Sequence, residues 1–413
     1  MAFPRRARRL LAALRAERRT LRQGFIALIL GAATAFVAGI ALGSITETLK
    51  TLPGLFILIP AAIGMRGTIF GAMGARLGTS THAGLFEVTR NRNGILYQNL
   101  FAAVVSTFSS TLWLAALATL AAALFGLESI SFLQFVTIAV VGGIIDSAIL
   151  LAITVGLSVL SYRRGYDLDA VATPLITATA DMITIPVLFL AARLVLVIPD
   201  VVNVIVAVAM ILACLFATIR GALTDLPLAR RILIEMAAVI VLTPMLDVLA
   251  GTVVEARLDR FVAFPALLVL VPPFVAVAGA LGGILSSRLS SKLQLGVISP
   301  RGRPEGPALL DAAITVVFGF VIFLALGGLG LGYTVVSGTA SPGAATLVLG
   351  TLVAGLLATL IAIPVSYYVA IVTTRFGLDP DNHSVPIITS VMDLSGVVCF
   401  LAVLSLFGVA ANG

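Results

Sequence analysis

Charged residues are scarce in this sequence. Only 11% of its 413 residues are Asp, Glu, Lys or Arg, and 60% are apolar, whereas soluble domains carry about 25% charged and 45–50% apolar residues. A water-soluble globular protein of this composition could not cover its surface with polar groups, so that class is excluded. A transmembrane β-barrel is excluded too, because the apolar stretches are continuous and do not alternate. The composition is typical of a polytopic α-helical membrane protein.

Cysteine, histidine and lysine are also rare, with two residues of each. Cys214 and Cys399 both lie inside apolar runs, so we expect buried thiols. Neither a disulfide framework nor a Cys/His metal cluster is indicated. Arg therefore supplies nearly all of the 26 basic residues that give the chain its net charge of +7.

Apolar windows divide the chain into eleven predicted spans, each long enough for the ~20 residues that a bilayer requires. Their approximate ranges are 24–46, 53–75, 95–125, 130–162, 172–198, 200–220, 232–254, 264–287, 308–334, 342–374 and 384–409. The sequence therefore predicts an all-α protein with about eleven transmembrane helices.

The positions of the basic residues orient these spans. With the N-terminus cytoplasmic, 21 basic residues fall on the inner side and only Lys50, Arg257 and Arg260 fall outside. This split follows the positive-inside rule and places the C-terminus outside. We expect an integral protein of a prokaryotic cell membrane, in contact with the lipid bilayer. The basic charge then reports topology and lipid contact, and no nucleic-acid partner is expected.

The chain carries an internal duplication at one constant offset. Residues 53–84 align without gaps with 265–296, and residues 167–181 align with 379–393 at the same offset. The matched positions include Pro53/Pro265, Pro60/Pro272, Gly67/Gly279, Arg76/Arg288, Gly84/Gly296 and Asp181/Asp393. Chance similarity between apolar segments would not keep Asp, Arg and Pro in register across two widely separated blocks.

The number of spans sets the orientation of the repeats. Two five-span repeats fused directly would be inverted, but the extra span at 200–220 restores the direction of the second repeat. We predict two parallel five-helix repeats, at 24–199 and 232–413, related by a pseudo-twofold axis along the membrane normal. Residues 1–23 form a basic cytoplasmic segment, and residues 200–231 form the linking helix and an inner loop.

Two aspartates fall at equivalent mid-span positions. Asp181 and Asp393 each lie about ten residues, or ~15 Å, beyond the inner end of a span, close to the bilayer middle. Ionisable groups at this depth are costly and mark functional sites. Carboxylates accompanied by hydroxyls are the hard oxygen ligands that Mg²⁺ or Ca²⁺ prefers. We predict that this pair binds a divalent cation, with a proton-carrying or structural role as the alternative.

Polar side chains precede each of these aspartates at four- or eight-residue steps on one helix face. In the first repeat they are Asp169, Thr173 and Thr177, and in the second they are Asp381 and Thr389. We expect Thr177 and Thr389 to assist in metal binding. Asp169, Thr173 and Asp381 are candidates for gating or pairing.

Three more charged residues lie at similar depth without a charged counterpart in the other repeat. The pairs of equivalent positions are Asp146/Ala358, Asp247/Ala35 and Arg66/Ala278. We predict that Asp146 and Asp247 line the cation path and bind the metal, with a structural or proton-linked role as the alternative. Arg66 would repel a cation, so we expect it to pair with an acid, contact backbone carbonyls or act in gating.

Two blocks resemble the MgtE-type magnesium transporters, in the duplicated form seen in eukaryotic solute carrier family 41. They are IPAAIGMRGTIFGAMGARLGTS at 59–80 and GLDPDNHSVPIITSVMDLSG at 377–396. The resemblance implies Mg²⁺ transport and a magnesium-binding role for the last Asp of the second block, which maps onto Asp393 and Asp181. The Asn that follows the basic-Gly pair in the family is Thr68 here.

These observations predict a divalent cation transporter or channel, with Mg²⁺ as the bound and transported ion. The alternatives are a cation-coupled carrier of another divalent metal or small solute, and an intramembrane enzyme with paired aspartates; we expect no enzymatic activity. Only the segment 1–23 precedes the first span, so we expect none of the cytoplasmic sensor domains of bacterial relatives. A monomer could form a complete path because both repeats share one chain, and a dimer is the alternative.

Overall fold

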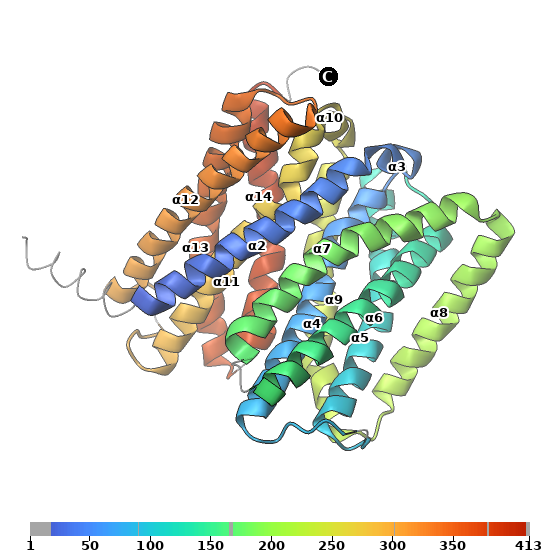
Figure 1. Ribbon diagram of the computed structural model, residues 1–413, viewed down its shortest axis with the longest axis vertical. Helices are drawn as coiled ribbons and strands as arrows, with labels where there is room; N and C mark the ends of the chain where they lie inside the picture. The colour runs from blue at the N-terminus through green and yellow to red at the C-terminus, as the bar shows by residue number, and fades with distance from the viewer. Residues whose placement is uncertain (1–17, 90, 165–167, 301, 378–379, 410–413) are drawn as a thin grey trace, which may run out of the picture.

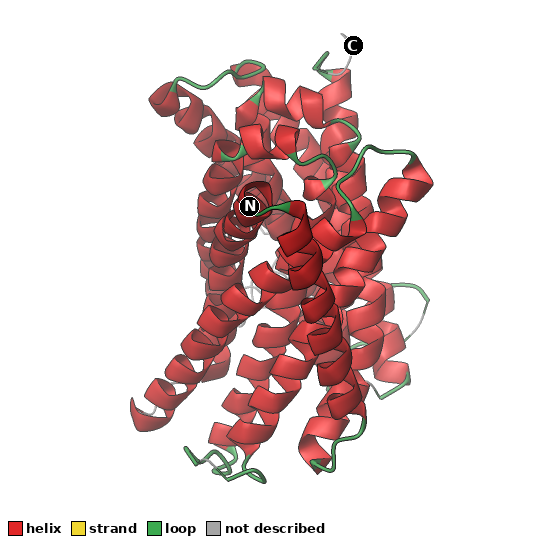
Figure 2. Ribbon diagram, turned by 90° about the vertical axis from the view of Figure 1, so that its right-hand side faces the viewer, coloured by secondary structure: helices red, strands yellow, loops and turns green. Residues whose placement is uncertain are grey.

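The computed structural model describes residues 18–89, 91–164, 168–300, 302–377 and 380–409. Within these ranges the chain is almost entirely helical and contains no strand (Figure 2). A chain this apolar forms helices because each backbone N–H and C=O then finds a partner inside its own segment. Eleven of the described helices are long and apolar enough to cross a membrane. The predicted all-α polytopic class is confirmed.

The helices fall into two sets around α8 (Asp200–Ala222). The first set is α2 (Arg18–Ser44), α3 (Thr46–Thr51), α4 (Leu55–His82), α5 (Ile95–Phe125), α6 (Phe132–Arg164) and α7 (Leu168–Val197). The second set is α9 (Pro227–Glu255), α10 (Leu258–Ala263), α11 (Pro265–Gln294), α12 (Gly306–Ser337), the π-helical turn η1 (Thr346–Gly350) with α13 (Thr351–Arg375), and α14 (Pro380–Leu406). When the first set is shifted by the offset of the duplication, its boundaries fall within one turn of those of the second.

The short helices α3 and α10 were not predicted from the sequence. They occupy equivalent places after the first long helix of each set, and both lie at the same end of the molecule (Figure 1). Each gives the chain a brief lateral course before it turns back into the bundle.

Glycines end equivalent elements in the two sets. Gly126 follows α5 with φ of 63°, and Gly338 follows α12 with φ of 66°. Residues with a Cβ rarely adopt this left-handed conformation, whereas glycine adopts it readily at the end of a helix. The duplication has therefore preserved the turn chemistry together with the helices.

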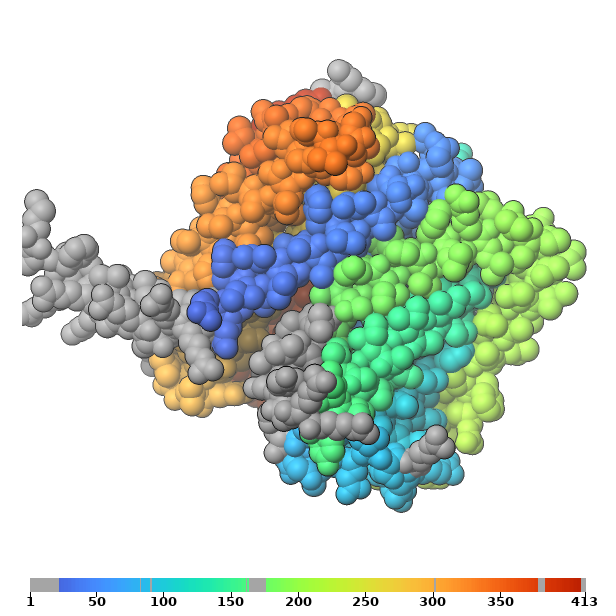
Figure 3. All heavy atoms as spheres, viewed as in Figure 1, coloured from blue at the N-terminus to red at the C-terminus, as the bar shows by residue number. Residues whose placement is uncertain are grey.

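The first long helix of each set packs on the second long helix of the other set. α2 lies along α11, and α9 lies along α4; α2 crosses the front of the molecule between the two groups of helices (Figures 1 and 3). The contacts are equivalent, because a Cβ at Gly39 of α2 would overlap the backbone of Val269, and one at Gly251 of α9 would overlap that of Ile57. Small residues permit this close approach in membranes.

Burial places α4 and α11 at the centre of the molecule. In their most apolar windows 67% and 72% of residues are buried, compared with 17% for α8. α8 lies at the edge of the bundle (Figure 1), and many of its apolar side chains are exposed. Residues on α4 and α11 are therefore the ones best placed to face an interior site.

Equivalent polar contacts tie each central helix to the helix that follows it. Arg76 Nε of α4 donates to Asn99 Oδ1 of α5 over 2.9 Å. In the second set, Arg288 and Lys292 of α11 both pair with Asp311 of α12, at 2.6 and 2.7 Å. Arg76 and Arg288 occupy equivalent positions in the aligned blocks, and so do their partners Asn99 and Asp311. The contact was therefore duplicated, and its partner is neutral in the first repeat and acidic in the second.

Candidate functional site

The four aspartates predicted to form a site lie in the interior of four different helices. Asp146 is on α6, Asp181 on α7, Asp247 on α9 and Asp393 on α14. Asp146 and Asp247 are 1% exposed, whereas Asp181 and Asp393 are partly exposed. The four acids therefore differ in exposure, with Asp146 and Asp247 enclosed by the bundle.

Asp247 combines burial with a lack of close hydrogen-bond partners. Ser390 and Asp393 of α14 lie near it, but neither of its buried carboxylate oxygens has a hydrogen-bond partner among the described residues. An ionised carboxylate removed from water without a partner is strongly destabilising. A cation, water or a proton at this position would stabilise the side chain, as would a small movement toward Ser390.

Asp247 and Asp393 converge on Gly64 of α4. A Cβ built on Gly64 would lie 2.8 Å from Asp247 Oδ2 and 4.0 Å from Asp393 Oδ2. The absence of a side chain at this glycine leaves room for both carboxyl groups. Asp393 is also within electrostatic range of Asp181, so carboxyl groups of α7, α9 and α14 gather beside α4. We call Asp181, Asp247 and Asp393 the carboxylate group of the site.

Asp146 has a different environment, because it pairs with Arg66. Arg66 Nε donates to both carboxylate oxygens of Asp146, at 2.8 and 3.0 Å. The two side chains are only 1% and 2% exposed. Ser147 Oγ adds a hydrogen bond to Asp146 Oδ1 at 3.2 Å. The charge of Asp146 is thus neutralised inside the first repeat, and Arg66 is occupied by a named partner.

The two predicted threonines lie where the central helices meet α7 and α14. A Cβ on Gly67 of α4 would lie 3.9 Å from Thr177 Cγ2, and a Cβ on Gly279 of α11 would lie 3.2 Å from Thr389 Cγ2. Thr389 Oγ1 donates to the carbonyl oxygens of Val385 and Pro386. Its oxygen lone pairs remain able to accept or to coordinate.

Three predicted residues are not placed by the structure. The side chains of Asp169, Thr173 and Asp381 lie outside the described part of the chain. Their assignment to gating or pairing stays a prediction.

No preformed metal cage is present in the described ranges. Within them, no three His, Cys, Asp or Glu side chains are close enough together to hold a metal ion directly. The described carboxylates could therefore hold an ion only with help from water or from neutral oxygens. Mg²⁺ commonly keeps several of its waters when it binds to protein.

Glu255 positions α4 and was missed in the sequence. It lies at the end of α9, and its two carboxylate oxygens accept the backbone N–H groups of Gly54 and Phe56, at 2.7 and 3.1 Å. It thereby caps the start of the helix that carries Gly64. An acid at a helix C-terminus opposes the helix dipole, so its position was a signal that it had a partner elsewhere.

Comparison with known proteins finds one family. The profile of the MgtE family, described as a divalent cation transporter, matches residues 59–191 and 271–403. The offset of the duplication carries the first matched range onto the second without a shift at either end. The second repeat thus has its own match, as the duplication predicted.

Two curated relatives match over most of their length. Solute carrier family 41 member 3 of Rattus norvegicus is 24% identical over 406 residues, covering 91% of this chain and 86% of the relative. The Mus musculus protein of the same name is 25% identical over 383 residues, covering 85% and 75%. Both relatives are mammalian, so the expected prokaryotic membrane stays a prediction from sequence.

One solved structure covers nearly the whole chain at low similarity. The crystal structure of the eukaryotic MATE transporter AtDTX14 aligns with 95% of this chain and 96% of its own, at 14% identity and a TM-score of 0.33. A likeness of this degree does not assign a shared fold.

Proposed function

Because the chain belongs to the MgtE divalent cation transporter family, we propose that it carries Mg²⁺ across a membrane along a path lined by Asp181, Asp393 and Asp247. The family indicates divalent cations in general, and the proposal names the ion and the side chains that bind it. It has no need of a catalytic step, since the chemistry consists of binding and releasing an ion.

The observation that carries this proposal is the environment of Asp247. Its carboxylate is buried without a hydrogen-bond partner in the described chain and lies beside Asp393 at Gly64. Neighbouring carboxylates repel one another, and the repulsion is stronger at low dielectric. A divalent cation between them would relieve the repulsion and replace the missing hydrogen bonds.

The donor set favours a hard cation. Carboxylates and the hydroxyls of Thr177 and Thr389 offer oxygen only, which suits Mg²⁺, Ca²⁺ or Mn²⁺ better than Zn²⁺. Because no three acidic, His or Cys side chains in the described ranges could hold a metal ion by themselves, the site favours an ion that retains part of its water shell, and Mg²⁺ does so most strongly.

Asp146 has a supporting role in this proposal. Because Arg66 neutralises it, Asp146 is not expected to bind the ion. The pair instead fixes α4 against α6, and it keeps the arginine charge away from the carboxylate group. Thr177 and Thr389 lie against the glycines of α4 and α11 and would hold α7 and α14 at the same depth.

The organisation predicted from the sequence completes the proposal. The repeats at 24–199 and 232–413 would run parallel about an axis normal to the membrane, with residues 200–231 linking them. The N-terminus would be cytoplasmic and the C-terminus outside. A single chain would contain the whole path.

Flux measurements test the proposal. The full chain is reconstituted in liposomes, and Mg²⁺ entry is followed with an internal indicator. Asp181→Asn, Asp393→Asn and Asp247→Asn should each lower the flux by at least about tenfold, equivalent to ~1.4 kcal/mol in the barrier. Asp225→Asn, in the exposed loop between α8 and α9, is the matched control and should retain wild-type flux.

Two outcomes would overturn the assignment. Wild-type flux in Asp181→Asn and Asp393→Asn would remove the carboxylates from the path. Absence of Mg²⁺ flux in the wild-type protein, with Mn²⁺ or Ca²⁺ flux present, would keep the path but change the ion.

A further inference from the structure

Two equivalent helix contacts flank the carboxylate group. α9 packs against α4 and α14, and α2 packs against α11 and α7 in the equivalent arrangement. A site that used both repeats equally would carry the same chemistry at both contacts. Three pairs of equivalent positions instead differ, and each places the polar side chain or the open space on the α9 side. They are Asp247/Ala35, Ser390/Ala178 and Gly64/Ala276.

Ser390 is a polar residue of the α9 contact that was not predicted from the sequence. It precedes Asp393 by three residues on α14, so the two side chains lie on the same face of that helix. Ser390 is 3% exposed and lies near the carboxylate of Asp247. A hydroxyl group both donates and accepts, so it can orient a carboxylate and can also coordinate a cation through its oxygen.

Asp247 is the side chain at this contact that points to a ligand. It is 1% exposed, and neither of its carboxylate oxygens has a hydrogen-bond partner among the described residues. Its Oδ2 lies beside Gly64, and Asp393 Oδ2 lies near the same glycine. A cation held between the two carboxylates would compensate the charge of Asp247, which is costly to bury alone.

The α2 contact has a different composition. Ala35 and Ala178 replace the acid and the hydroxyl, and both alanines are buried. Ala276 carries a methyl group at the position where Gly64 leaves open space. Of the four positions compared, only Asp181 keeps the oxygen donors of its counterpart, Asp393.

We propose that the ion binds to one side of the predicted pseudo-twofold axis, between Asp247, Asp393 and Ser390. Asp181 then meets the ion during passage and does not belong to the tight site. This assignment rests on the proposed function and places the bound ion at one of the two equivalent contacts. Two carboxylates match the charge of Mg²⁺, Ser390 adds a neutral oxygen, and water completes the coordination. No third acidic, His or Cys ligand is then needed, in agreement with the described ranges.

A symmetric site between Asp181 and Asp393 is the alternative. Their carboxylates are within electrostatic range of each other. Such a site would leave the charge of Asp247 buried without compensation, which is unfavourable. It would also give no role to the joint presence of Asp247, Ser390 and Gly64 at one contact. The observations therefore favour the asymmetric site.

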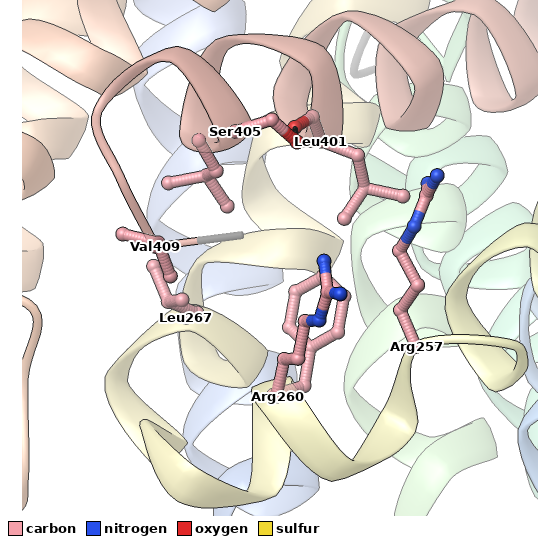
Figure 4. A pocket seen from close by; sticks show the side chains of 8 residues that line it. Arg257, Arg260, Leu267, Leu401, Ser405 and Val409 are labelled. Atoms are coloured by element: carbon pink, nitrogen blue, oxygen red, sulfur yellow. Dashed lines mark hydrogen bonds between the residues drawn. The ribbon is translucent and has the colours of Figure 1, made fainter. Parts of the chain in front are cut away.

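A depression at the end of the molecule where α10 lies is not an entry to this site. It lies beside α10, the start of α11 and the end of α14 (Figure 4). Its cavity volume is about 20 Å³, which suffices for one water but not for a hydrated Mg²⁺ ion. Leu267, Leu401 and Leu404 of its wall are 2%, 7% and 5% exposed. We therefore assign no ligand to it.

Calorimetric titration of the full chain in detergent with Mg²⁺ tests the asymmetric site. The wild type should bind one ion. Asp247→Asn and Asp393→Asn should each weaken binding by at least about tenfold, because each removes a charge that contacts the ion. Asp181→Asn should change the affinity by less than about threefold, because its charge acts only from a distance, although it lowers the flux.

A matched pair of variants isolates the hydroxyl group. Ser390→Ala should weaken Mg²⁺ binding by about three- to tenfold, the range expected for one lost polar contact. Ala178→Ser adds the same hydroxyl at the equivalent position, where α2 carries Ala35, and should bind like the wild type. In the Asp247→Asn background, Ser390→Ala should have little further effect, because the two groups act together. Wild-type affinity in Ser390→Ala would overturn the role of this residue.

Thermal unfolding in metal-free detergent checks the fold of each variant. The Asp→Asn variants should unfold no earlier than the wild type, because each loses a negative charge from a group of neighbouring carboxylates. If Asp247→Asn does unfold early, Asp181→Asn, Asp393→Asn and Ser390→Ala still distinguish the two sites.

Equal losses of affinity in Asp181→Asn and Asp393→Asn, or binding of two equivalent ions, would show a symmetric site and overturn the inference. Absence of both Mg²⁺ binding and Mg²⁺ flux in the wild type would instead overturn the proposed function. The same variants titrated with Mn²⁺ would then test the position of the site, and the same ranking of affinities would support it.

Discussion

The first repeat contains a buried ion pair, Arg66 with Asp146, at positions where the second repeat has Ala278 and Ala358. Both members of the pair are present in one repeat and both are absent from the other. The helices around them nevertheless begin and end at nearly equivalent residues. The backbone arrangement therefore does not depend on this pair, and the charge is a specialisation of one side of the molecule.

A second difference follows the same line. Asp247 lies beside Gly64, whereas the equivalent positions are Ala35 and Ala276. At one of the two contacts between repeats a carboxylate faces a glycine, and at the equivalent contact both residues are alanines. Because α9 packs on α4, Asp247 joins Arg66 and Asp146 around the same central helix. The duplicated scaffold has gathered its unmatched charges around α4 and kept α11 apolar at these positions.

Removing only one member of the buried pair should have the largest effect. Arg66→Ala leaves Asp146 buried without a counter-charge, and breaking a pair in this way typically destabilises a protein by about 3–5 kcal/mol. Arg66→Ala/Asp146→Ala reproduces the second repeat and should recover much of the loss. Unfolding in detergent measures both. A double variant no more stable than Arg66→Ala would contradict the view that the pair is dispensable as a unit.

Filling the space at Gly64 should have the next largest effect. In Gly64→Ala the new Cβ would lie 2.8 Å from Asp247 Oδ2, so the carboxylate must move, at a typical overpacking cost of about 1–3 kcal/mol. We expect Mg²⁺ flux to fall by roughly tenfold, since ~1.4 kcal/mol corresponds to that factor. Gly31→Ala, where a Cβ meets nothing within 4 Å, is the matched control and should transport normally.

A companion variant sharpens this test. Gly64→Ala/Asp247→Ala installs alanine at both positions, as in the equivalent contact of Ala276 with Ala35. It should be more stable than Gly64→Ala, because the new methyl group no longer meets a carboxylate, but it should lose flux. Retention of flux would mean that Asp247 is not part of the path.

Removing the cap on α4 should have a moderate effect. Glu255→Ala leaves the N–H groups of Gly54 and Phe56 without their acceptors, and we expect a loss of about 1–2 kcal/mol. The position equivalent to Glu255 is Gly43, so α11 manages without this cap. Glu255→Gln retains one acceptor and should fall between the wild type and Glu255→Ala in thermal unfolding; an unchanged Glu255→Ala would refute the role.

Giving the Arg76–Asn99 contact the same charge as the Arg288–Asp311 contact should have the smallest effect. Asn99→Asp gives Arg76 the acidic partner that Arg288 already has in Asp311. We expect a change in unfolding free energy of less than about 1 kcal/mol, because the desolvation of a partly buried pair offsets its attraction. Asp311→Asn should be more harmful, since it removes the carboxylate that Arg288 and Lys292 share. The reverse order of the two effects would contradict this interpretation.

The sequence predicted the repeated framework well, because register and spacing are local information. The constant offset, the eleven spans and the equivalence of Asp181 with Asp393 all follow from positions along the chain. The short helices α3 and α10 did not, since helices of this length carry too weak a periodicity to detect. Their surroundings in the folded bundle decide their conformation.

The sequence could not predict which side chains of different helices contact one another. Arg66 was expected to pair or to gate, but hydropathy cannot tell which of several acids at equal depth lies opposite a given arginine. The joint replacement of Arg66 and Asp146 by alanine in the second repeat was an available signal. The convergence of Asp247 and Asp393 on Gly64 had no such signal, because it depends on α9 crossing to the other repeat.

The packing of α2 on α11, a helix of the other repeat, has a consequence for biosynthesis. α2 is the first described helix to leave the ribosome, yet its principal partner α11 is completed only at Gln294. Until then the close-packing face at Gly39 lacks its partner, and more than half of the chain must be made before its contact with Val269 can form. Contacts so distant in sequence form late. We therefore expect maturation to occur in one concerted step near the end of translation, with a chain stopped after α8 left as a substrate for membrane proteases.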